Sequence, residues 1–364
     1  MITVIYSGNS KMFDGVLLSV LSMARRTKET LNIKLLSMDL TSIKATFTSF
    51  NEKQASFIDN YLKKYNKDNT FELIDCTDLY NQYLAHNKNE SSHYSPYAVL
   101  RLLLNHIPGM PEKLIYLDCD TMVYGDIKEL YDINIEGYEY AAVHDYMGKF
   151  WISKNYINSG VLLLNLKECK KTKLLERSIE MVNKKKMEFP DQKPLNILVK
   201  SRLFLPARFN EQREVKSDTI VKHFVRGIRY FPFFYIYNIK QWDIEKVHSF
   251  LKIHEFDKDY DEYTSIKSKL DAKIQKEYEE KNKKYIIQVT NLRKSYGDVH
   301  AVDGITFNVK RGSLFAFLGE NGAGKSTTIN IIASILYKDS GKVFIDGCDL
   351  DHESNSIKKE IGIV

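Results

Sequence analysis

The sequence has few cysteines and no long apolar run. Its four cysteines are scattered, without a CxxC pair or a disulfide-like spacing, which predicts free thiols in a reducing, cytoplasmic setting. No apolar stretch approaches the roughly 20 residues that a membrane-spanning helix needs. Residues 1–7 lack the basic region and the apolar core of a signal peptide and are typical of a first β-strand. These absences favour a globular cytoplasmic protein.

The chain also lacks a strong charge of one sign. Its formal net charge is +6, with 27% charged and 43% hydrophobic residues, as in ordinary globular proteins. This is no nucleic-acid-binding signature, so we expect no nucleic-acid partner. A nucleotide, or the anionic inner face of a membrane, remains compatible with the mild positive charge. The 364 residues suit two domains, or one large domain and one partial domain.

The first part of the chain alternates between two hydrophobic periodicities. Residues 2–7, 33–40 and 71–76 are typical of strands, whereas 13–26 and 52–64 have helical spacing. This βαβ rhythm predicts an α/β domain with a mostly parallel sheet covered by helices. Further strands are expected at 140–144, 160–165 and 220–224, and further helices at 97–106, 167–186 and 191–198.

Two aspartates follow the apolar run 113–117, which reads as a buried strand. Side chains alternate along a strand, so we expect Asp118 and Asp120 to point one way and Cys119 the other. Ligands bind at the carboxyl ends of strands in open α/β sheets. Two carboxylates there can hold a divalent cation and leave room for diphosphate oxygens. The alternative is a solvated pair, which occurs often by chance.

The composition changes over residues 264–284, which are highly charged and have few apolar anchors. This segment predicts a solvated helix or linker, and we expect the domain boundary inside it. A new strand pattern begins at residue 285. Downstream, residues 319–327 match G-x-x-x-x-G-K-[ST], the Walker A loop, between an expected strand at 314–318 and an expected helix at 328–336.

This strand–loop–helix context predicts a phosphate-binding loop. Its glycines allow backbone N–H groups to wrap the phosphates, and the helix N-terminus adds a positive dipole. Lys325 would reach the β- and γ-phosphates, and Ser326 would bind Mg²⁺. The predicted ATP-binding residues of this loop are Gly319, Asn321, Gly322, Gly324, Lys325, Ser326 and Thr327.

Residues 285–364, including "LRKSYGDVHAVDGITFNVKRGSLFAFLGENGAGKSTTINIIASILYKDSGKVFIDG", resemble the start of an ABC-transporter ATPase domain. The resemblance implies that Tyr296 stacks on adenine; the alternative is a packed strand aromatic. The sequence stops at Val364, before the family's glutamine loop, signature and Walker B strand. We therefore expect a truncated P-loop NTPase fragment, in which ATP and Mg²⁺ binding is open and ATP hydrolysis is not expected.

Residues 1–263 resemble glycosyltransferase family 8, enzymes of the GT-A (Rossmann-like) fold that retain anomeric configuration. The resemblance is carried by "KLIYLDCDTMVYGDI", "YINSGVLLLNL", "PDQKPLN", "RFNEQ" and "VKHF", in this order. It implies transfer of a hexose from a UDP-sugar to a glycan or lipid-linked acceptor. It also implies a Mn²⁺ or Mg²⁺ cofactor. The competing hypothesis is an ABC-transporter ATP-binding protein whose front domain is secondary or joined artefactually.

The resemblance also implies roles for individual residues. Asp118, Asp120 and His223 would bind the metal, although a histidine on an apolar strand is more often a core residue. Asp145 and Asp191 would accept hydrogen bonds from sugar hydroxyls. Gln192 would face the anomeric carbon as a poor nucleophile, which favours front-face attack. Residues 191–192 are equally compatible with helix capping after a proline. The sugar pocket would be lined by Asn158, Ser159 and Gly160.

The nucleotide end of the donor is implied by three further segments. The base and ribose would lie on the end of the first strand, at Tyr6, Ser7, Gly8 and Asn9. Gly8 stands where the family often has an acidic residue. His93 and Arg101 fall on the segment before the metal strand, with Arg101 near the donor. Arg229 falls where the family has a lysine on the diphosphate, within a motif ending Lys-Pro-Trp; here Lys240-Gln241-Trp242 comes later.

Overall fold

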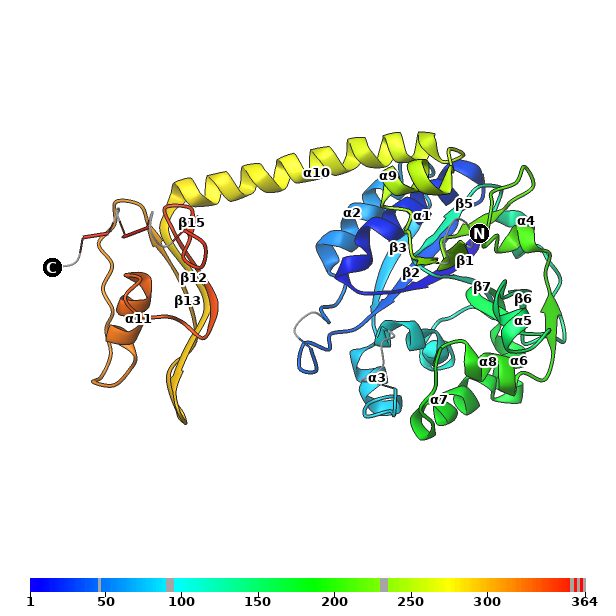
Figure 1. Ribbon diagram of the computed structural model, residues 1–364, viewed down its shortest axis with the longest axis horizontal. Helices are drawn as coiled ribbons and strands as arrows, with labels where there is room; N and C mark the ends of the chain where they lie inside the picture. The colour runs from blue at the N-terminus through cyan, green and yellow to red at the C-terminus, as the bar shows by residue number, and fades with distance from the viewer. Residues whose placement is uncertain (45–46, 90–94, 230–234, 354–356, 359–360, 363–364) are drawn as a thin grey trace. The chain divides into compact units, whose positions relative to one another are not determined.

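The computed structural model describes residues 1–44, 47–89, 95–229, 235–353, 357–358 and 361–362 (Figure 1). The chain divides into two compact units, Met1–Thr264 and Ser265–Val364. Helix α10 (Asp257–Lys284) is continuous and includes the charged segment 264–284. Each unit has its own hydrophobic core.

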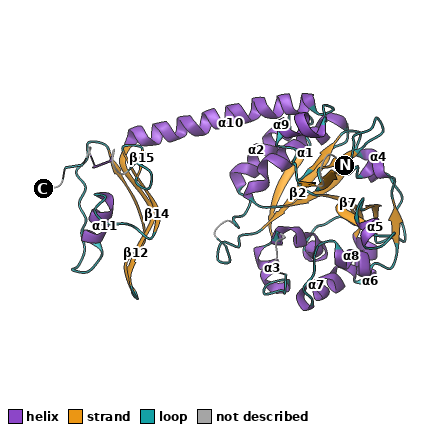
Figure 2. Ribbon diagram, viewed as in Figure 1, coloured by secondary structure: helices purple, strands orange, loops and turns teal. Residues whose placement is uncertain are grey.

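A seven-stranded sheet organises the first unit, in the order β3-β2-β1-β4-β7-β6-β8. Figure 2 draws its strands in orange among the purple helices of the unit. Neighbouring strands from β3 to β4 are parallel, β8 is parallel to β6, and β7 runs antiparallel to both of its neighbours. The expected α/β class with a mostly parallel sheet is confirmed. The strands are β1 (Ile2–Ser7), β2 (Leu31–Ser37), β3 (Thr70–Asp75), β4 (Lys113–Leu117), β6 (Tyr140–His144), β7 (Ile157–Asn165) and β8 (Arg202–Phe204).

Short strand pairs flank this sheet. β5 (Thr121–Val123) pairs with β9 (Val221–His223), and β10 (Gly227–Arg229) pairs with β11 (Tyr235–Tyr237). The helical elements of the unit before α10 are η1 (Ser10–Met12), α1 (Phe13–Arg26), α2 (Glu52–Leu62), α3 (Thr77–Tyr83), η2 (Pro96–His106), α4 (Lys128–Tyr131), α5 (Gly148–Trp151), α6 (Leu166–Thr172), α7 (Leu174–Lys184), α8 (Lys193–Leu198), η3 (Ala207–Phe209), α9 (Ile244–Lys246) and η4 (Val247–Leu251).

Two helix predictions need correction. The single helix expected over 167–186 is wrong: Lys173 has a left-handed backbone, with φ of 57°, and separates α6 from α7. A left-handed residue cannot continue a right-handed ladder, so the chain turns there. The expected helix at 97–106 is a 3₁₀ helix, η2, and it starts at Pro96. A 3₁₀ helix is wound more tightly than an α-helix, so its side chains project in different directions from those of an α-helix.

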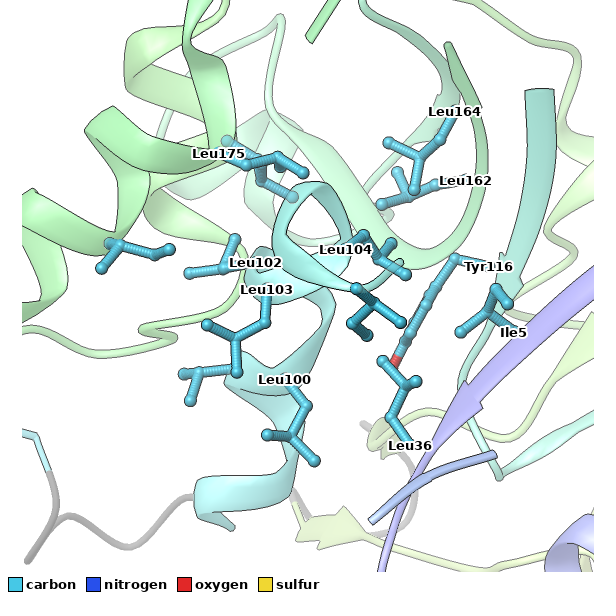
Figure 3. Packing of buried hydrophobic residues seen from close by; sticks show 14 of the residues in the cluster. Ile5, Leu36, Leu100, Leu102, Leu103, Leu104, Tyr116, Leu162, Leu164 and Leu175 are labelled. Carbon is cyan, nitrogen blue, oxygen red and sulfur yellow. The ribbon is translucent and has the colours of Figure 1, made fainter. Parts of the chain in front are cut away.

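The leucines of η2 pack against one face of the sheet (Figure 3). Leu100, Leu103 and Leu104 belong to a buried cluster with Ile5 of β1 and Tyr116 of β4. Each fully buried leucine contributes roughly 1.5–3 kcal/mol relative to exposure. Arg101 lies within η2, so the packing of the neighbouring leucines fixes the position of its backbone.

The strand order reverses between β1 and β4, because β2 and β3 follow β1 on one side and β4 lies on the other. Such a switch point opens a crevice beyond the carboxyl ends of the strands. Asp118 follows β4 at this edge. Since β7 runs antiparallel to β4, with Leu117 opposite Val161, the start of β7 lies at the same edge. Asn158, Ser159 and Gly160 are thereby brought beside Asp118.

The second unit contains a four-stranded antiparallel sheet in the order β13-β12-β14-β15, and helix α11 (Lys325–Ile332). Its strands are β12 (Tyr285–Tyr296), β13 (Val299–Lys310), β14 (Ser340–Ile345) and β15 (Cys348–Asp349). The strand expected at 314–318 is wrong: the segment has no strand structure, and Leu314 is 100% exposed and Leu318 is 92% exposed. The reason is that no described strand pairs with this segment.

Two further findings concern cysteines and membranes. Cys76, Cys119 and Cys169 are buried free thiols, and Cys348 is half-buried. Among the residues that the structure describes, there is no helix with the length and apolarity needed to span a bilayer.

Candidate active site and phosphate loop

Asp118, Asp120 and His223 converge at the switch point. One potential ligand atom from each lies within 4.8 Å of the others. His223 Nε2 is 3.1 Å from Asp120 Oδ1 and 3.8 Å from Asp118 Oδ2. The pairing of β5 with β9 sets His223 opposite Thr121, immediately after Asp120. Two carboxylates and an imidazole form a donor set that fits a divalent metal ion.

Asn210 holds the other side of the histidine ring. Asn210 Oδ1 lies 3.2 Å from His223 Nδ1, and the amide is buried. An amide oxygen accepts a hydrogen bond, so Nδ1 is the donor in this contact, and Nε2 faces the carboxylates. The same amide donates from Nδ2 to Asn158 Oδ1 at 3.0 Å. Sequence analysis missed Asn210, although it lies within the quoted "RFNEQ" segment.

Gly160 is required by the close packing of this cluster. A Cβ atom at Gly160 would lie 2.1 Å from His223 Cε1 and 2.7 Å from Asp118 Oδ2. Real Cβ atoms do not approach other atoms so closely. A side chain at this position would therefore displace two of the potential metal ligands.

Arg101 is a buried guanidinium that joins three parts of the site. Its Nη2 donates to Asp118 Oδ1 at 2.7 Å and lies 3.3 Å from Asp191 Oδ2. Its Nη1 donates to the Ser159 carbonyl oxygen at 2.6 Å, and its guanidinium carbon lies 4.1 Å from the centre of the Tyr116 ring. Burial by itself would lower the pKa of Arg101, but the neighbouring Asp118, phenol and Asp191 outweigh it and raise the pKa. Arg101 therefore remains charged.

Ser159 is also held by the pair 191–192. Gln192 Oε1 accepts a hydrogen bond from the Ser159 backbone N–H at 2.8 Å. Ser159 Oγ donates to Asp191 Oδ2 at 3.2 Å. Burial raises the pKa of Asp191 above its ordinary value, against the opposing charge of Arg101. Helix α8 has Gln192 at its N-cap without a side-chain capping bond, so the capping interpretation of this pair is wrong.

Asp145 connects the sugar-pocket candidates to a neighbouring turn. Its Oδ1 accepts hydrogen bonds from the backbone N–H groups of Met147, at 3.1 Å, and Gly148, at 2.6 Å. Its Oδ2 accepts from Asn158 Nδ2 at 3.0 Å. Asp145, Asn158, Asn210 and His223 thus form a continuous hydrogen-bonded chain that leads to the carboxylate of Asp120.

The end of β1 is tightly packed. Tyr6 is fully buried, with its hydroxyl 2.8 Å from Ser19 Oγ on α1, and Ser7 Oγ lies 2.6 Å from the Tyr116 hydroxyl. Asn9 Oδ1 accepts from the backbone N–H of Lys11. A Cβ atom added to Gly8 would lie 3.1 Å from Cys119 Sγ, which leaves little room for an acidic side chain. His93 lies outside the described residues.

Besides Arg101, a second cation reaches the metal candidates: Lys240, which sequence analysis did not select. Its Nζ forms an ion pair with Asp120 and donates to the Phe224 carbonyl oxygen at 3.0 Å. Burial would raise the pKa of Asp120, but the interactions with His223 and Lys240 outweigh burial and lower it. Arg229 instead lies over the Phe250 ring, with its guanidinium carbon 4.1 Å from the ring centre.

Residues 240–242 contact both the candidate site and helix α1. Gln241 is fully buried and donates from Nε2 to the Cys119 carbonyl oxygen at 2.6 Å. A Cβ atom at Gly15 of α1 would lie 2.6 Å from Trp242, so the glycine admits the indole. The lysine and tryptophan of this segment are the sequence signal that could have drawn attention to Lys240.

The Walker A loop has the backbone that its glycines predict. Gly319, Gly322 and Gly324 have φ of 155°, 90° and 78°, which L-residues rarely adopt. Lys325 opens α11, and its Nζ donates to the carbonyl oxygens of Gly319 at 2.7 Å and Glu320 at 2.6 Å. The loop residues Asn321 and Ser326 are exposed, and Thr327 is half-buried. Tyr296 is 51% exposed, so the packed-aromatic alternative does not describe it.

Comparisons with known proteins agree with this architecture. The fold of the first unit is that of the GT-A-like glycosyltransferases: the galactosyltransferase LgtC, solved with donor and acceptor sugar analogues, matches with a TM-score of 0.53 at 16% identity over 72% of this chain and 96% of LgtC. The glycosyltransferase GlyE of Streptococcus pneumoniae TIGR4 matches with a TM-score of 0.50 at 19% identity, over 75% of this chain and 64% of GlyE.

The family follows from the sequence match. The family model for glycosyl transferase family 8 matches residues 3–229, and the chain belongs to this family.

The second unit matches a different family. The ABC transporter model matches residues 302–364. The ribose import ATP-binding protein RbsA of Ruegeria sp. is 46% identical over 21% of this chain and 15% of RbsA. The linearmycin resistance ATP-binding protein LnrL of Bacillus subtilis is 43% identical over 22% of this chain and 25% of LnrL. The chain thus spans between 15% and 25% of the length of these two relatives, and this part is an ABC ATPase-like fragment.

Proposed function

We propose that this protein is a metal-dependent, retaining glycosyltransferase that moves a hexose from a UDP-sugar to a glycan or lipid-linked acceptor. The observation that carries the proposal is the convergence of Asp118, Asp120 and His223 at the switch point of the sheet. The buried Arg101 and the nearby Lys240 add positive charge on both sides of the carboxylates. Membership of glycosyl transferase family 8 supports the reaction class.

Asp118, Asp120 and His223 would hold the metal, and the mixed carboxylate and imidazole ligands favour Mn²⁺ over Mg²⁺. When bound, the ion would supply electrostatic stabilisation to the diphosphate of the departing UDP. Asn210 is a positioning residue, because its contact with Nδ1 orients the His223 ring. Lys240 would turn from Asp120 toward the diphosphate, where an ammonium offsets developing negative charge.

The sugar would lie over the start of β7. Asn158, Ser159 and Gly160 form the floor of the proposed pocket, and Asp145 and Asp191 supply carboxylate oxygens to sugar hydroxyls. Gln192 is a positioning residue rather than a nucleophile, because its Oε1 already accepts a hydrogen bond from the Ser159 backbone. We therefore favour front-face attack by the acceptor, with Arg101 holding Asp191 and Ser159 in place.

The nucleotide would bind beside the end of β1. The hydroxyl groups of Tyr6 and Ser7 form hydrogen bonds in the interior, so these residues would act by fixing the backbone conformation of this loop. Gly8 and Asn9 would meet the base and ribose, and His93 would contribute from the segment before η2. A cytoplasmic enzyme that works at the inner face of the membrane would meet a lipid-linked acceptor there.

A second candidate function rests on the Walker A loop. The three glycines with positive φ, followed by Lys325 at the start of α11, form a backbone suited to the phosphates of ATP with Mg²⁺. We propose nucleotide binding for this loop, with Tyr296 as the exposed aromatic for adenine. ATP hydrolysis is not part of this proposal.

The test of the main proposal is a donor screen with the full chain. Hydrolysis of UDP-glucose, UDP-galactose and UDP-N-acetylglucosamine is measured with Mn²⁺, with Mg²⁺ and with a chelator. We expect one donor to be cleaved well and the chelator to abolish cleavage. Equal rates with and without chelator would refute the metal-dependent mechanism, and no turnover of any UDP-sugar would refute the proposed donor class. Peptide mass spectrometry across residues 269–294 tests whether both units share one polypeptide in cells.

A further inference from the structure

A second set of metal-ligand side chains lies where η4, a π-helix, leads into α10. His248 is on η4, His254 follows it in the connecting turn, and Asp257 is the first residue of α10. One potential ligand atom from each residue lies within 4.8 Å of the others. This cluster shares no residue with the Asp118, Asp120 and His223 set.

The distances within this cluster suit a transition-metal ion. His248 Nε2 is 3.0 Å from Asp257 Oδ1, and His254 Nδ1 is 3.5 Å from Asp257 Oδ2. Ligands at about 2.0–2.2 Å from a tetrahedral Zn²⁺ lie roughly 3.4 Å from one another. The two imidazole rings are stacked, with centres 4.7 Å apart and an angle of 18° between their planes. Both rings therefore present a nitrogen to the same carboxylate.

The hydrogen bonding of His248 is incomplete. Its Nε2 is buried and forms no hydrogen bond within the described part of the chain, even though a carboxylate oxygen is 3.0 Å away. The ring of Tyr260 packs edge-on against this imidazole at 5.6 Å, and the buried Tyr260 hydroxyl also has no hydrogen-bond partner there. Buried polar atoms are normally paired, so a buried imidazole nitrogen that lies beside a carboxylate without a hydrogen bond to it indicates a ligand that the protein chain itself does not supply.

We propose that His248, His254 and Asp257 bind a zinc ion, with water as the fourth ligand. Two imidazoles and one carboxylate suit Zn²⁺ better than Ca²⁺ or Mg²⁺, which prefer oxygen ligands. The site differs in this respect from the first cluster, which has two carboxylates and one imidazole. A π-helical turn is uncommon and frequently occurs at functional sites, which agrees with the position of His248 on η4.

The zinc ion would clamp η4 to the start of α10. Phe256, inside the clamped turn, is fully buried and packs against Phe224 and Tyr124, with ring centres 6.5 and 5.8 Å away. The backbone N–H of Phe224 donates to the Asp120 carbonyl oxygen at 2.9 Å. Zinc would thus stabilise the turn that packs against Phe224, the residue that follows His223 and bonds to the backbone of Asp120. Its role would be structural.

The test is to titrate Zn²⁺ into the metal-free full chain by isothermal calorimetry near neutral pH, where imidazoles are available as ligands. The variants are His254→Ala and Asp257→Asn, whose side chains are 59% and 50% exposed, so neither change should prevent folding. His352→Ala, at an exposed histidine of the second unit, is the matched control. We expect each of the first two variants to bind one zinc ion fewer per chain, and the control to match the wild type.

A second measurement uses the Asp120→Asn background, in which the first cluster has lost one ligand. In that background Zn²⁺ should raise the melting temperature, and adding His254→Ala should remove the rise, because a ligand stabilises only the state that binds it. If His254→Ala and Asp257→Asn bind as much zinc as the wild type, the cluster is an ordinary histidine–aspartate contact and the proposal is overturned. An unchanged melting temperature on adding Zn²⁺ to the Asp120→Asn chain would overturn it as well.

Discussion

Arg101 Nη2 lies 2.7 Å from Asp118 Oδ1, although the two residues belong to different elements and Arg101 is 2% exposed. The same nitrogen lies 3.3 Å from Asp191 Oδ2. One buried guanidinium thus fixes a potential metal ligand and a potential sugar ligand relative to each other. The position of Arg101 is set in turn by the leucines of η2, so the hydrophobic core holds the site together.

Replacing Arg101 by Met should destabilise the first unit by about 3 kcal/mol. The change keeps the volume of the side chain but leaves Asp118 and Asp191 without their partner, and breaking a buried ion pair costs roughly 3–5 kcal/mol. Urea unfolding followed by fluorescence measures the effect. Arg208→Met, which removes an exposed ion pair to Glu129, is the control and should cost under about 1 kcal/mol. Equal midpoints for Arg101→Met and the wild type would contradict the structural role.

Asp120→Asn should lower metal-dependent UDP-sugar hydrolysis by roughly 100-fold or more, because the electrostatic stabilisation of the leaving diphosphate depends on this carboxylate. The measurement is turnover over a range of Mn²⁺ concentrations, with circular dichroism to confirm the fold. Asp132→Asn removes an exposed carboxylate paired with Lys128 and should leave turnover unchanged. Unchanged turnover in Asp120→Asn would remove the metal assignment.

Parallel alanine substitutions distinguish the contributions of Lys240 and Arg229 to the reaction. Lys240→Ala should reduce kcat about 100-fold, because the cation beside Asp120 no longer offsets charge on the diphosphate. Arg229→Ala should stay close to the wild type, since Arg229 packs on Phe250. Steady-state kinetics with the preferred donor decide between them. The reverse order of effects would restore the sequence-based assignment of Arg229.

Asn210 should affect metal affinity through His223. Asn210→Ala removes the acceptor for His223 Nδ1 and should weaken Mn²⁺ binding about 10–100-fold. Asn210→Asp keeps that acceptor but loses the donor to Asn158, so it should retain most of the metal affinity. Mn²⁺ binding followed by electron paramagnetic resonance separates the two variants. If both variants bind alike, Asn210 does not orient the histidine.

The Walker A loop can be tested independently of the transferase. Lys325→Ala should weaken binding of a fluorescent ATP analogue at least about tenfold, because the lysine supplies charge to the β- and γ-phosphates. UDP-sugar hydrolysis should be unaffected, and it should also survive a cut after Lys284. Saturable ATP binding that ignores Lys325→Ala would contradict the loop assignment, whereas a loss of hydrolysis on cutting would show that the second unit matters to the first.

Sequence patterns determined the local elements of the first unit. The apolar run 113–117 forms β4 and the periodic run 13–26 forms α1. An element that is buried against a core needs apolar residues at the spacing of its own geometry, so this spacing is visible in the sequence. The patterns failed at Lys173, where a left-handed residue turns the chain and ends a helix. They also failed at 314–318, where strand formation depends on a pairing partner. A strand exists only as half of a pair, and its partner is remote in sequence.

The candidate site divides in the same way. Asp118 and Asp120 are recognisable from their place after an apolar strand, and the Walker A glycines from their spacing, since both depend on a few consecutive residues. Asn210 and Lys240 gained their places only when the segments that carry them folded against His223 and Asp120. The sequence alone therefore determined which chemical groups the protein offers, whereas the tertiary structure decided which of them meet, because hydrogen bonds and ion pairs act only between atoms a few ångströms apart.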